Sequence, residues 1–342
     1  MNYQEVLEMS KGHMGEWCRS CPVCNGKACS NHIPGPGAKG TGTVAVRNYE
    51  DWQKVFVNVD TIASGNEVDT SFTIFGRTFR YPVFAGPVGA VDMHYSDELN
   101  DTSYNDILVR GAKEAGIAAW TGDGMDPQIM IAATRSIGVN EGTGIPTIKP
   151  WPLEMVREKL ALVKKSGAFA FAMDIDAAGL PFLKTFTPPA GRKSVEELRR
   201  IKEESGLPFI IKGIMTVDGA KKAMMAGADA IVVSNHGGRV QDGVPSTASV
   251  LGPIADAVQG KMKIFVDGGI RSGVDVFKAL AMGADAVLIA RPFVNAVYGA
   301  REDGIRVLAD QLGQELADTM RMCGATDLKS IGRDMVVTPF AK

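Results

Sequence analysis

The segment Ser234-Asn235-His236-Gly237-Gly238-Arg239 has the clearest chemical potential in this sequence. It directly follows the apolar run Ala230–Val233. His236 can accept a proton near neutral pH, and Arg239 is a fixed cation three residues later that can hold an anion. The neighbouring glycines would let the backbone approach a ligand closely, which a purely structural histidine would not need. This pairing predicts an enzyme with a base beside an anionic substrate.

Other polar side chains also stand directly after apolar runs. Lys212 ends the run Phe209-Ile210-Ile211, where its ammonium could neutralise a developing anion or form a Schiff base, although it could also simply reach solvent. Further along the chain, two arginine-containing segments, the first of which also has two glycines, follow neighbouring runs. Such segments are typical of phosphate binding by backbone N–H groups, a helix N-terminus and arginines, whereas the alternative is a tight turn with surface arginines. The segments are Asp267-Gly268-Gly269-Ile270-Arg271 and Ala290-Arg291-Pro292.

Eight short apolar runs alternate with amphipathic stretches, and this order predicts a parallel β-sheet with helical crossovers. Eight units over about 250 residues favour a closed (β/α)₈ TIM barrel over an open sheet. No Gly-x-Gly-x-x-Gly follows the first run, which also argues against a dinucleotide-binding sheet. In a barrel the residues named above would converge at the carboxyl ends of the strands. The expected strands are Pro82–Ala85, Ile117–Trp120, Ile145–Ile148, Ala168–Met173, Pro208–Ile211, Ala230–Val233, Lys263–Val266 and Ala286–Ala290.

Helical periodicity separates these runs. We expect helices at Leu153–Ser166, Val195–Ser205 and Val274–Met282, and a long final helix with Ile305, Leu308, Leu312, Leu316 and Met320 on one face.

The composition limits the classes of molecule that the protein could bind. The 342 residues carry a net charge of −2, so no basic excess is present to neutralise nucleic-acid phosphates or anionic lipid. No apolar run approaches the ~18 residues that span a bilayer, and the first residues lack the order of a signal peptide. We therefore expect a cytoplasmic protein that acts on small molecules, with no nucleic-acid or membrane partner.

The N-terminal part differs in composition from the rest. Residues 1–80 are rich in cysteine and then in glycine and proline, and we expect them to form an extension packed on a barrel of residues 81–342. Four cysteines fall within twelve residues. In a chain without an export signal such clustering favours a metal site over disulfides, with free or partly paired thiols as the alternative. The four are Cys18, Cys21, Cys24 and Cys29.

Together, these motifs resemble the FMN-dependent α-hydroxy-acid oxidase and dehydrogenase family, whose members include glycolate oxidase, lactate oxidase and flavocytochrome b2. The motifs are Lys212-Gly213, the segment 234–239 with Asp242 and Pro245, Asp267–Val276 and Ala290–Pro292. The resemblance is dense from about residue 194 to residue 330 and weaker toward the N-terminus. It implies an FMN enzyme that oxidises a small anionic 2-hydroxy acid to the 2-oxo acid and passes the electrons to an acceptor. It also implies a homo-oligomer, a tetramer or an octamer.

The resemblance also implies roles for single residues. His236 would take either the α-proton or the hydroxyl proton, and Asp176 would pair with it. Arg239 would hold the substrate carboxylate. Lys212 would stabilise the reduced, anionic flavin. The residues expected to contact FMN are Pro87, Val88, Gly89, Thr121, Lys212, Ser234, His236, Gly237, Asp267, Gly269, Arg271, Ala290 and Arg291.

The sequence departs from the family pattern in two places. The third strand lacks the expected tyrosine and ends Pro146-Thr147-Ile148-Lys149, and the loop after the fourth strand lacks the second arginine. Lys149 or Lys184 would have to compensate. Two other classes therefore remain open: a flavin barrel driven by NAD(P)H or similar to type 2 isopentenyl diphosphate isomerase, and a non-catalytic flavin-binding electron relay.

The cysteine spacing Cys18-x₂-Cys21-x₂-Cys24-x₄-Cys29 is close to that of ferredoxin-type [4Fe–4S] ligation, in which the last interval is usually three. Zinc bound by the same cysteines is the alternative. An iron–sulfur cluster near the flavin would favour a dehydrogenase with a separate redox partner over an oxidase.

Overall fold

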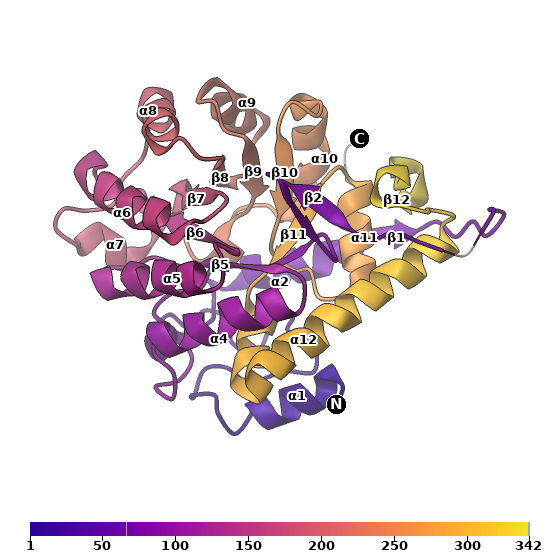
Figure 1. The fold of residues 1–342 in the computed structure, drawn as a ribbon. Coiled ribbons are helices and arrows are strands. Elements are labelled where there is room, and N and C mark those ends of the chain that lie inside the picture. Colours follow the sequence, from indigo (N-terminus) through magenta and orange to yellow (C-terminus); the bar gives the residue numbers. More distant parts are fainter. Residues whose placement is uncertain (66, 341–342) are drawn as a thin grey trace.

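The computed structural model describes residues 1–65 and 67–340. Eight parallel strands close into a barrel in the order β10-β11-β4-β5-β6-β7-β8-β9, which confirms the predicted (β/α)₈ architecture (Figure 1). All eight predicted strands are present, and each lies within two or three residues of the expected bounds. They are β4 (Val83–Ala85), β5 (Ala118–Thr121), β6 (Gly144–Ile148), β7 (Phe171–Asp174), β8 (Phe209–Ile214), β9 (Ala230–Val233), β10 (Lys263–Val266) and β11 (Ala286–Ile289).

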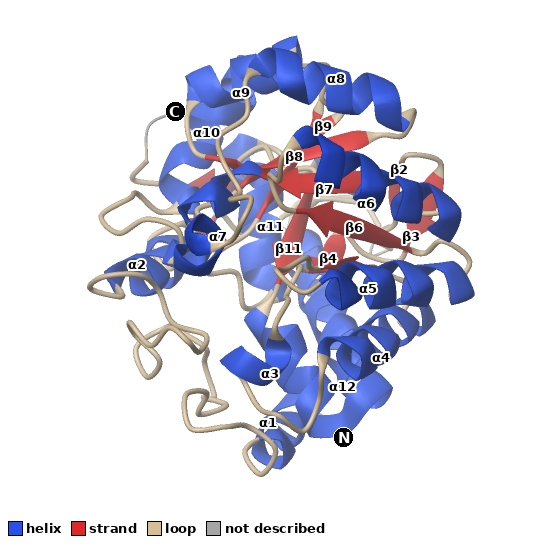
Figure 2. Cartoon of the chain, turned by 90° about the vertical axis from the view of Figure 1, so that its left-hand side faces the viewer, coloured by secondary structure: helices blue, strands red, loops and turns tan. Residues whose placement is uncertain are grey.

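Helices surround the barrel and connect its strands (Figures 1 and 2). Helices α6 and α8 have the predicted bounds, and α11 begins and ends one residue earlier than expected. The final helix α12 is interrupted at Ala300 and Arg301, which have non-helical backbone angles. The surrounding helices are α4 (Asp101–Glu114), α5 (Pro127–Val139), α6 (Leu153–Ser166), α8 (Val195–Ser205), α9 (Val217–Met225), α10 (Thr247–Val258), α11 (Gly273–Ala281) and α12 (Arg291–Met322).

Local sequence signals set the ends of these helices. Ser194 caps α8 by accepting a hydrogen bond from the backbone N–H of Glu197, whose side chain accepts one from the N–H of Ser194 in return. Helices α6 and α8 end at Gly167 and Gly206, and both glycines take up the left-handed conformation. These signals are local, which explains why the two helices could be delimited from sequence.

The amino-terminal end of the barrel is closed by a hairpin. Strands β2 (Phe72–Ile74) and β3 (Arg77–Phe79) pair antiparallel. The rings of Phe72 and Phe79 pack edge-on against Phe84 inside the barrel, with centroids 6.1 and 5.0 Å away. Because this end is filled by buried aromatic side chains, a ligand has access only at the carboxyl ends of the strands.

The remaining N-terminal residues lie at the outer side and the open end of the barrel (Figure 2). Helix α1 (Tyr3–Ser10) packs on α12, α2 (Thr43–Trp52) packs on α10 and on the short helix η2 (His236–Gly238), and a long loop joins α1 to α2. The division at residue 80 stays a prediction. Shorter elements complete the chain: β1 (Phe56–Val57), paired with β12 (Val336–Val337), α3 (Val91–His94), η1 (Ile175–Gly179), α7 (Pro181–Thr185), η3 (Leu328–Ser330) and η4 (Arg333–Met335).

Within the described residues, no helix is both long and apolar enough to cross a membrane.

Candidate active site

A large cavity opens at the carboxyl ends of the barrel strands, with a volume of about 1400 Å³ including its opening to solvent. Residues from the ends of seven strands line it together with the N-terminal loop. The predicted site residues that line it are Pro87, Val88, Gly89, Lys212, His236, Gly237, Arg239, Asp267, Gly269, Arg271, Ala290 and Arg291. Residues predicted from their positions after apolar runs and from the family resemblance thus line one cavity.

The backbone at His236, beside the cavity, has a strained conformation. His236 has φ 56°, and the two glycines after it have φ 63° and 84°. A non-glycine residue rarely adopts such an angle, and strain of this kind is often found at functional sites. The hydroxyl of Ser234 accepts a hydrogen bond from the His236 N–H at 3.1 Å, which helps to hold this turn.

His236 is paired with a carboxylate. Its Nδ1 lies 3.0 Å from Oδ1 of Asp176 and 3.9 Å from Oδ2 of Asp174. Burial, followed by the cations of Lys212 and Lys149, holds the pKa of His236 well below its usual range. Burial likewise raises the pKa of Asp176. The imidazole is therefore neutral at neutral pH, with one nitrogen held by Asp176, which suits a general base.

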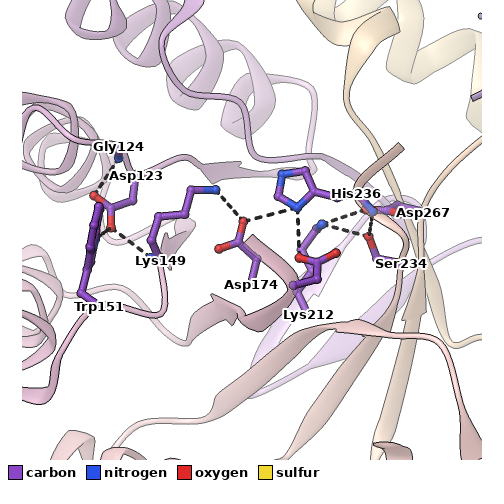
Figure 3. A network of polar contacts seen from close by, with 10 residues as sticks. Asp123, Gly124, Lys149, Trp151, Asp174, Lys212, Ser234, His236 and Asp267 are labelled. Carbon is purple, nitrogen blue, oxygen red and sulfur yellow. Dashed lines mark hydrogen bonds and ion pairs between the residues drawn. The ribbon is translucent and has the colours of Figure 1, made fainter. Parts of the chain in front are cut away.

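A second buried ion pair lies beside this one (Figure 3). The ammonium of Lys149 at the end of β6 donates to Oδ2 of Asp174 at 2.7 Å, and the two side chains are 11% and 2% exposed. Because Lys149 neutralises Asp174, the nearer Asp176 is the carboxylate left to orient His236.

Lys212 stands on the other side of His236 (Figure 3). Its ammonium donates to the hydroxyl of Ser234 at 2.9 Å and lies 3.3 Å from Oδ2 of Asp267. Burial acts to lower the pKa of Lys212, but Asp267, Asp176 and Asp174 outweigh burial and raise it. Lys212 thus stays protonated, so it can stabilise negative charge in the cavity but cannot act as the neutral amine of a Schiff base.

Arg239 is held by the N-terminal loop. Its guanidinium donates to the carbonyls of Gly35 and Gly37 at 2.7 and 2.9 Å, and a second guanidinium nitrogen lies 3.3 Å from Nε2 of His94. Burial, followed by the cations of Arg239 and Lys149, lowers the pKa of His94 to about 3. Nδ1 of the neutral His94 accepts the Gly35 N–H, so its Nε2 carries the ring proton, and His94 positions Arg239 by direct contact.

His94 and the loop 33–37 were not predicted as part of the site. His94 ends the short helix α3, nine residues after β4, and accepts a hydrogen bond from the N–H of Gly35 at 3.1 Å. The available signals were its place after the first strand and the glycine- and proline-rich composition of the loop. Neither signal indicates which strand end the loop would reach.

The far side of the cavity holds the predicted phosphate segments. Gly268 and Gly269 both have φ 87°, and a Cβ on Gly269 would overlap the carbonyl of Asn48 in α2. Arg271 and Arg291 line this side. Among the described residues, Nη1 of Arg291 and Oδ1 of Asp267 are buried polar atoms without a hydrogen-bond partner. Such atoms indicate that a polar ligand belongs here.

Three predicted residues stand behind the cavity wall and do not line it. Asp176 and Ser234 act on lining residues, since they contact His236 and Lys212. Thr121 ends β5 fully buried, and its hydroxyl has no partner in the part of the chain that the structure describes. Lys149 lines the cavity, and Lys184, the other candidate to replace the missing arginine, lies on α7 and is not among the lining residues.

The chain is similar in sequence and in structure to known proteins. Residues 35–182 and 182–338 match the family described as FMN-dependent dehydrogenase. A 4-hydroxymandelate oxidase of Amycolatopsis orientalis is 31% identical over 87% of this chain and 90% of its own length. An L-lactate dehydrogenase of Stenotrophomonas maltophilia (strain K279a) is 47% identical over 45% of this chain, and the match spans only 40% of that relative.

A solved structure of a mandelate oxidase variant with (S)-mandelic acid superimposes with a TM-score of 0.79 at 25% identity, covering 100% of this chain and 99% of that one. The family match extends over most of the chain and includes every strand-end motif of the cavity. The chain therefore belongs to the FMN-dependent dehydrogenase family.

Proposed function

We propose that this protein oxidises a small 2-hydroxy acid to the 2-oxo acid with FMN as the immediate electron acceptor. The observation that supports the proposal is that His236, paired with Asp176 and with a lowered pKa, lies in the same cavity as the cation Arg239. A base and an anion clamp on one substrate are what this oxidation requires of the protein.

The residues present fit FMN. The unpartnered Arg291 nitrogen, with Arg271 and the N-terminus of α12, would bind the phosphate, and Asp267 would bind the ribityl chain. The close approach of Gly122 to Val88, where a Cβ would lie 2.6 Å from the Val88 carbonyl, leaves a flat backbone wall for the ring. The rest of the FMN contacts are proposed to be Pro87, Gly89, Thr121, Lys212, Ser234, His236, Gly237, Gly269 and Ala290.

The chain's own residues would bind the substrate and move its proton. The guanidinium nitrogens of Arg239 that do not bind Gly35 and Gly37 would hold the carboxylate. Nε2 of His236 would remove a proton from the substrate, and Asp176 would stabilise the imidazolium through Nδ1. FMN, when bound, supplies the two-electron acceptor chemistry. Lys212 would neutralise negative charge that develops on the cofactor side.

Lys149 and His94 take the place of the missing second arginine and tyrosine in this proposal. Lys149 lines the cavity with its ammonium on Asp174, and His94 contacts Arg239. The family pattern of two cations at the substrate carboxylate would then be kept by Arg239 and Lys149. Apolar side chains on the same wall would receive the substituent of the hydroxy acid; these are Met93, Met125, Leu180 and Phe182.

The test is anaerobic mixing of the FMN-loaded protein with (S)-lactate, (S)-mandelate and glycolate in separate reactions, followed by flavin absorbance. We expect at least one acid to bleach the flavin and His236→Ala to abolish bleaching while FMN stays bound. His13→Ala is the matched control, because His13 is half exposed and pairs with Glu98 away from the cavity. Bleaching by NADPH alone, with none by any hydroxy acid, would refute the proposal in favour of an NAD(P)H-driven barrel.

By the same resemblance we propose a homo-tetramer or homo-octamer. Light scattering of the FMN-loaded protein would measure the assembly.

A further inference from the structure

A second, smaller cavity of about 360 Å³, including its opening to solvent, lies beside the start of α12. All four cysteines of the N-terminal loop line it, although the loop has no regular secondary structure there. Arg291 and Asn295 of α12 form its floor. The proposed oxidation uses none of the cysteines. The residues of interest are Cys18, Cys21, Cys24 and Cys29.

The four cysteines are free thiols that the fold has gathered, and none is in a disulfide. Cys29 is buried and the other three are partly buried. Cys18 Sγ lies 3.4 Å from Oδ1 of Asn295, a position that ties the first cysteine to α12. The loop turns at Ser20, Gly26 and Ser30, which all have a positive φ. These turns bring the four thiols to one cavity, as expected for a binding site.

Two arginines beside the cysteines favour negative charge in this cavity. The guanidinium of Arg271 donates to the Cys24 carbonyl at 2.6 Å and lies 3.8 Å from its Sγ. Arg291 lines this cavity together with Cys24 and Cys29, so its positive charge acts here as well. Two partly buried arginines next to four thiols match an anionic group bound through thiolates.

Four cysteines commonly bind either a single zinc ion or an iron–sulfur cluster, and the two sites differ in the distances between the sulfur atoms. A single tetrahedral zinc, with Zn–S bonds of about 2.3 Å, would hold its sulfurs about 3.8 Å apart. Within the described residues, the only three potential ligands whose atoms all lie within 4.8 Å of one another are Asp174, Asp176 and His236. No three of the cysteine sulfurs are that close to one another, so the loop is not arranged as a compact zinc site, and a polynuclear group with more widely separated ligands fits the spacing better.

We propose that Cys18, Cys21, Cys24 and Cys29 bind one [4Fe–4S] cluster. In the two-cluster ferredoxin spacing the fourth cysteine ligates the other cluster. Here the longer last interval returns Cys29 to the same cavity as the first three, which supplies four thiolates to one cluster.

The cluster site adjoins the proposed FMN site. Arg291 and Pro36 line both cavities, so the cluster site is next to the phosphate side of the proposed FMN site. We infer, resting on the proposed function, that the cluster carries electrons away from the reduced flavin. Each 2-hydroxy acid oxidised releases two electrons and two protons. The cluster would cycle twice between its 2+ and 1+ states and reduce two equivalents of a one-electron acceptor, a redox protein in the cell or ferricyanide in an assay.

The first test is iron and acid-labile sulfide analysis of the full chain purified without oxygen, with electron paramagnetic resonance after dithionite reduction. We expect about four iron and four sulfide per chain and the signal of a reduced cluster. Cys21→Ala should lose most of the iron and this signal. The matched control Cys323→Ala should keep both, because Cys323 is buried next to the end of α12, far along the chain from the loop. Retained FMN in Cys21→Ala would show that the barrel still folds.

Stoichiometric zinc in place of iron, or no metal after anaerobic reconstitution with iron and sulfide, would overturn the cluster proposal. A reduced-cluster signal after (S)-lactate or (S)-mandelate would support electron transfer, and a bleached flavin beside a cluster that dithionite alone reduces would overturn it. Failure of the proposed function looks different, because the iron, sulfide and dithionite signal would all be present while no hydroxy acid bleaches the flavin.

Discussion

Nδ1 of His236, which follows β9, lies 3.0 Å from Oδ1 of Asp176, which follows β7, and only β8 stands between these two strands in the barrel. This contact holds Nδ1 and leaves Nε2 for the proposed proton transfer.

Asp176→Asn should therefore slow flavin reduction by about 10² to 10⁴-fold, because the amide can neither fix the tautomer nor stabilise the imidazolium. Anaerobic stopped-flow absorbance with a saturating hydroxy acid measures the rate. Asp106→Asn is the control, since Asp106 pairs with Arg135 at the surface. A rate close to that of the unmodified protein would remove Asp176 from the mechanism.

The rate of flavin reduction should decrease at low pH only below the usual pKa range of histidine. The pKa of His236 is lowered, so the imidazole stays neutral, and active as a base, while pH falls through about 6.5. The lowered pKa also affects stability. Below about pH 6.5 the histidine of the unfolded chain gains a proton that His236 in the folded protein does not, so the free energy of unfolding decreases as the pH falls. Flavin-reduction rates from pH 4.5 to 8 test the first point, and a half-maximal rate at or above 6.5 would contradict it.

Lys149→Gln should shift the acid limb of the pH–rate profile to higher pH. The substitution removes a cation that lowers the pKa of His236 and leaves the Asp174 carboxylate, 3.9 Å away, without its partner. Both changes favour the imidazolium. The same pH series on the variant measures the shift. Lys184→Gln, on α7, is the control and should leave the profile in place.

Arg239→Met should weaken substrate binding by about 2 to 5 kcal/mol, the usual cost of removing one partner of a buried charged pair. Arg239→Lys should recover only part of this, because lysine cannot bind the carbonyls of Gly35 and Gly37 and the substrate at once. The dependence of the flavin-reduction rate on hydroxy-acid concentration gives the dissociation constants. Equal constants for the lysine variant and the unmodified protein would show that charge alone is recognised.

Gly269→Ala should destabilise the protein well beyond Gly243→Ala. Both glycines have positive φ, which costs alanine about 1 to 2 kcal/mol. A Cβ at Gly243 meets nothing within 4 Å, whereas one at Gly269 overlaps the Asn48 carbonyl and forces α2 away from β10. Urea unfolding of the two variants compares the costs. Similar free energies of unfolding would mean that α2 yields at little cost.

The sequence alone determined the barrel and most of the strand-end residues. Parallel strands buried on both faces, such as β9, are continuous apolar runs, and the polar residue after each run must lie at the same edge of the sheet. His236, Lys212 and Asp267 could therefore be placed in one site without knowledge of their contacts. Capping residues and left-handed glycines are equally local, and they fixed the ends of α6 and α8.

Only the tertiary structure decided which partners these residues have. The contact of Arg239 with Gly35 and His94 joins segments separated by 204 and 145 positions, and no local pattern encodes such a distance. The spread of the cysteines and the single arginine shared by their cavity and the FMN cavity also depend on how the N-terminal loop packs against α12. The spacing of the cysteines suggested a metal, but only the packing of the loop shows that their cavity adjoins the cavity proposed for FMN.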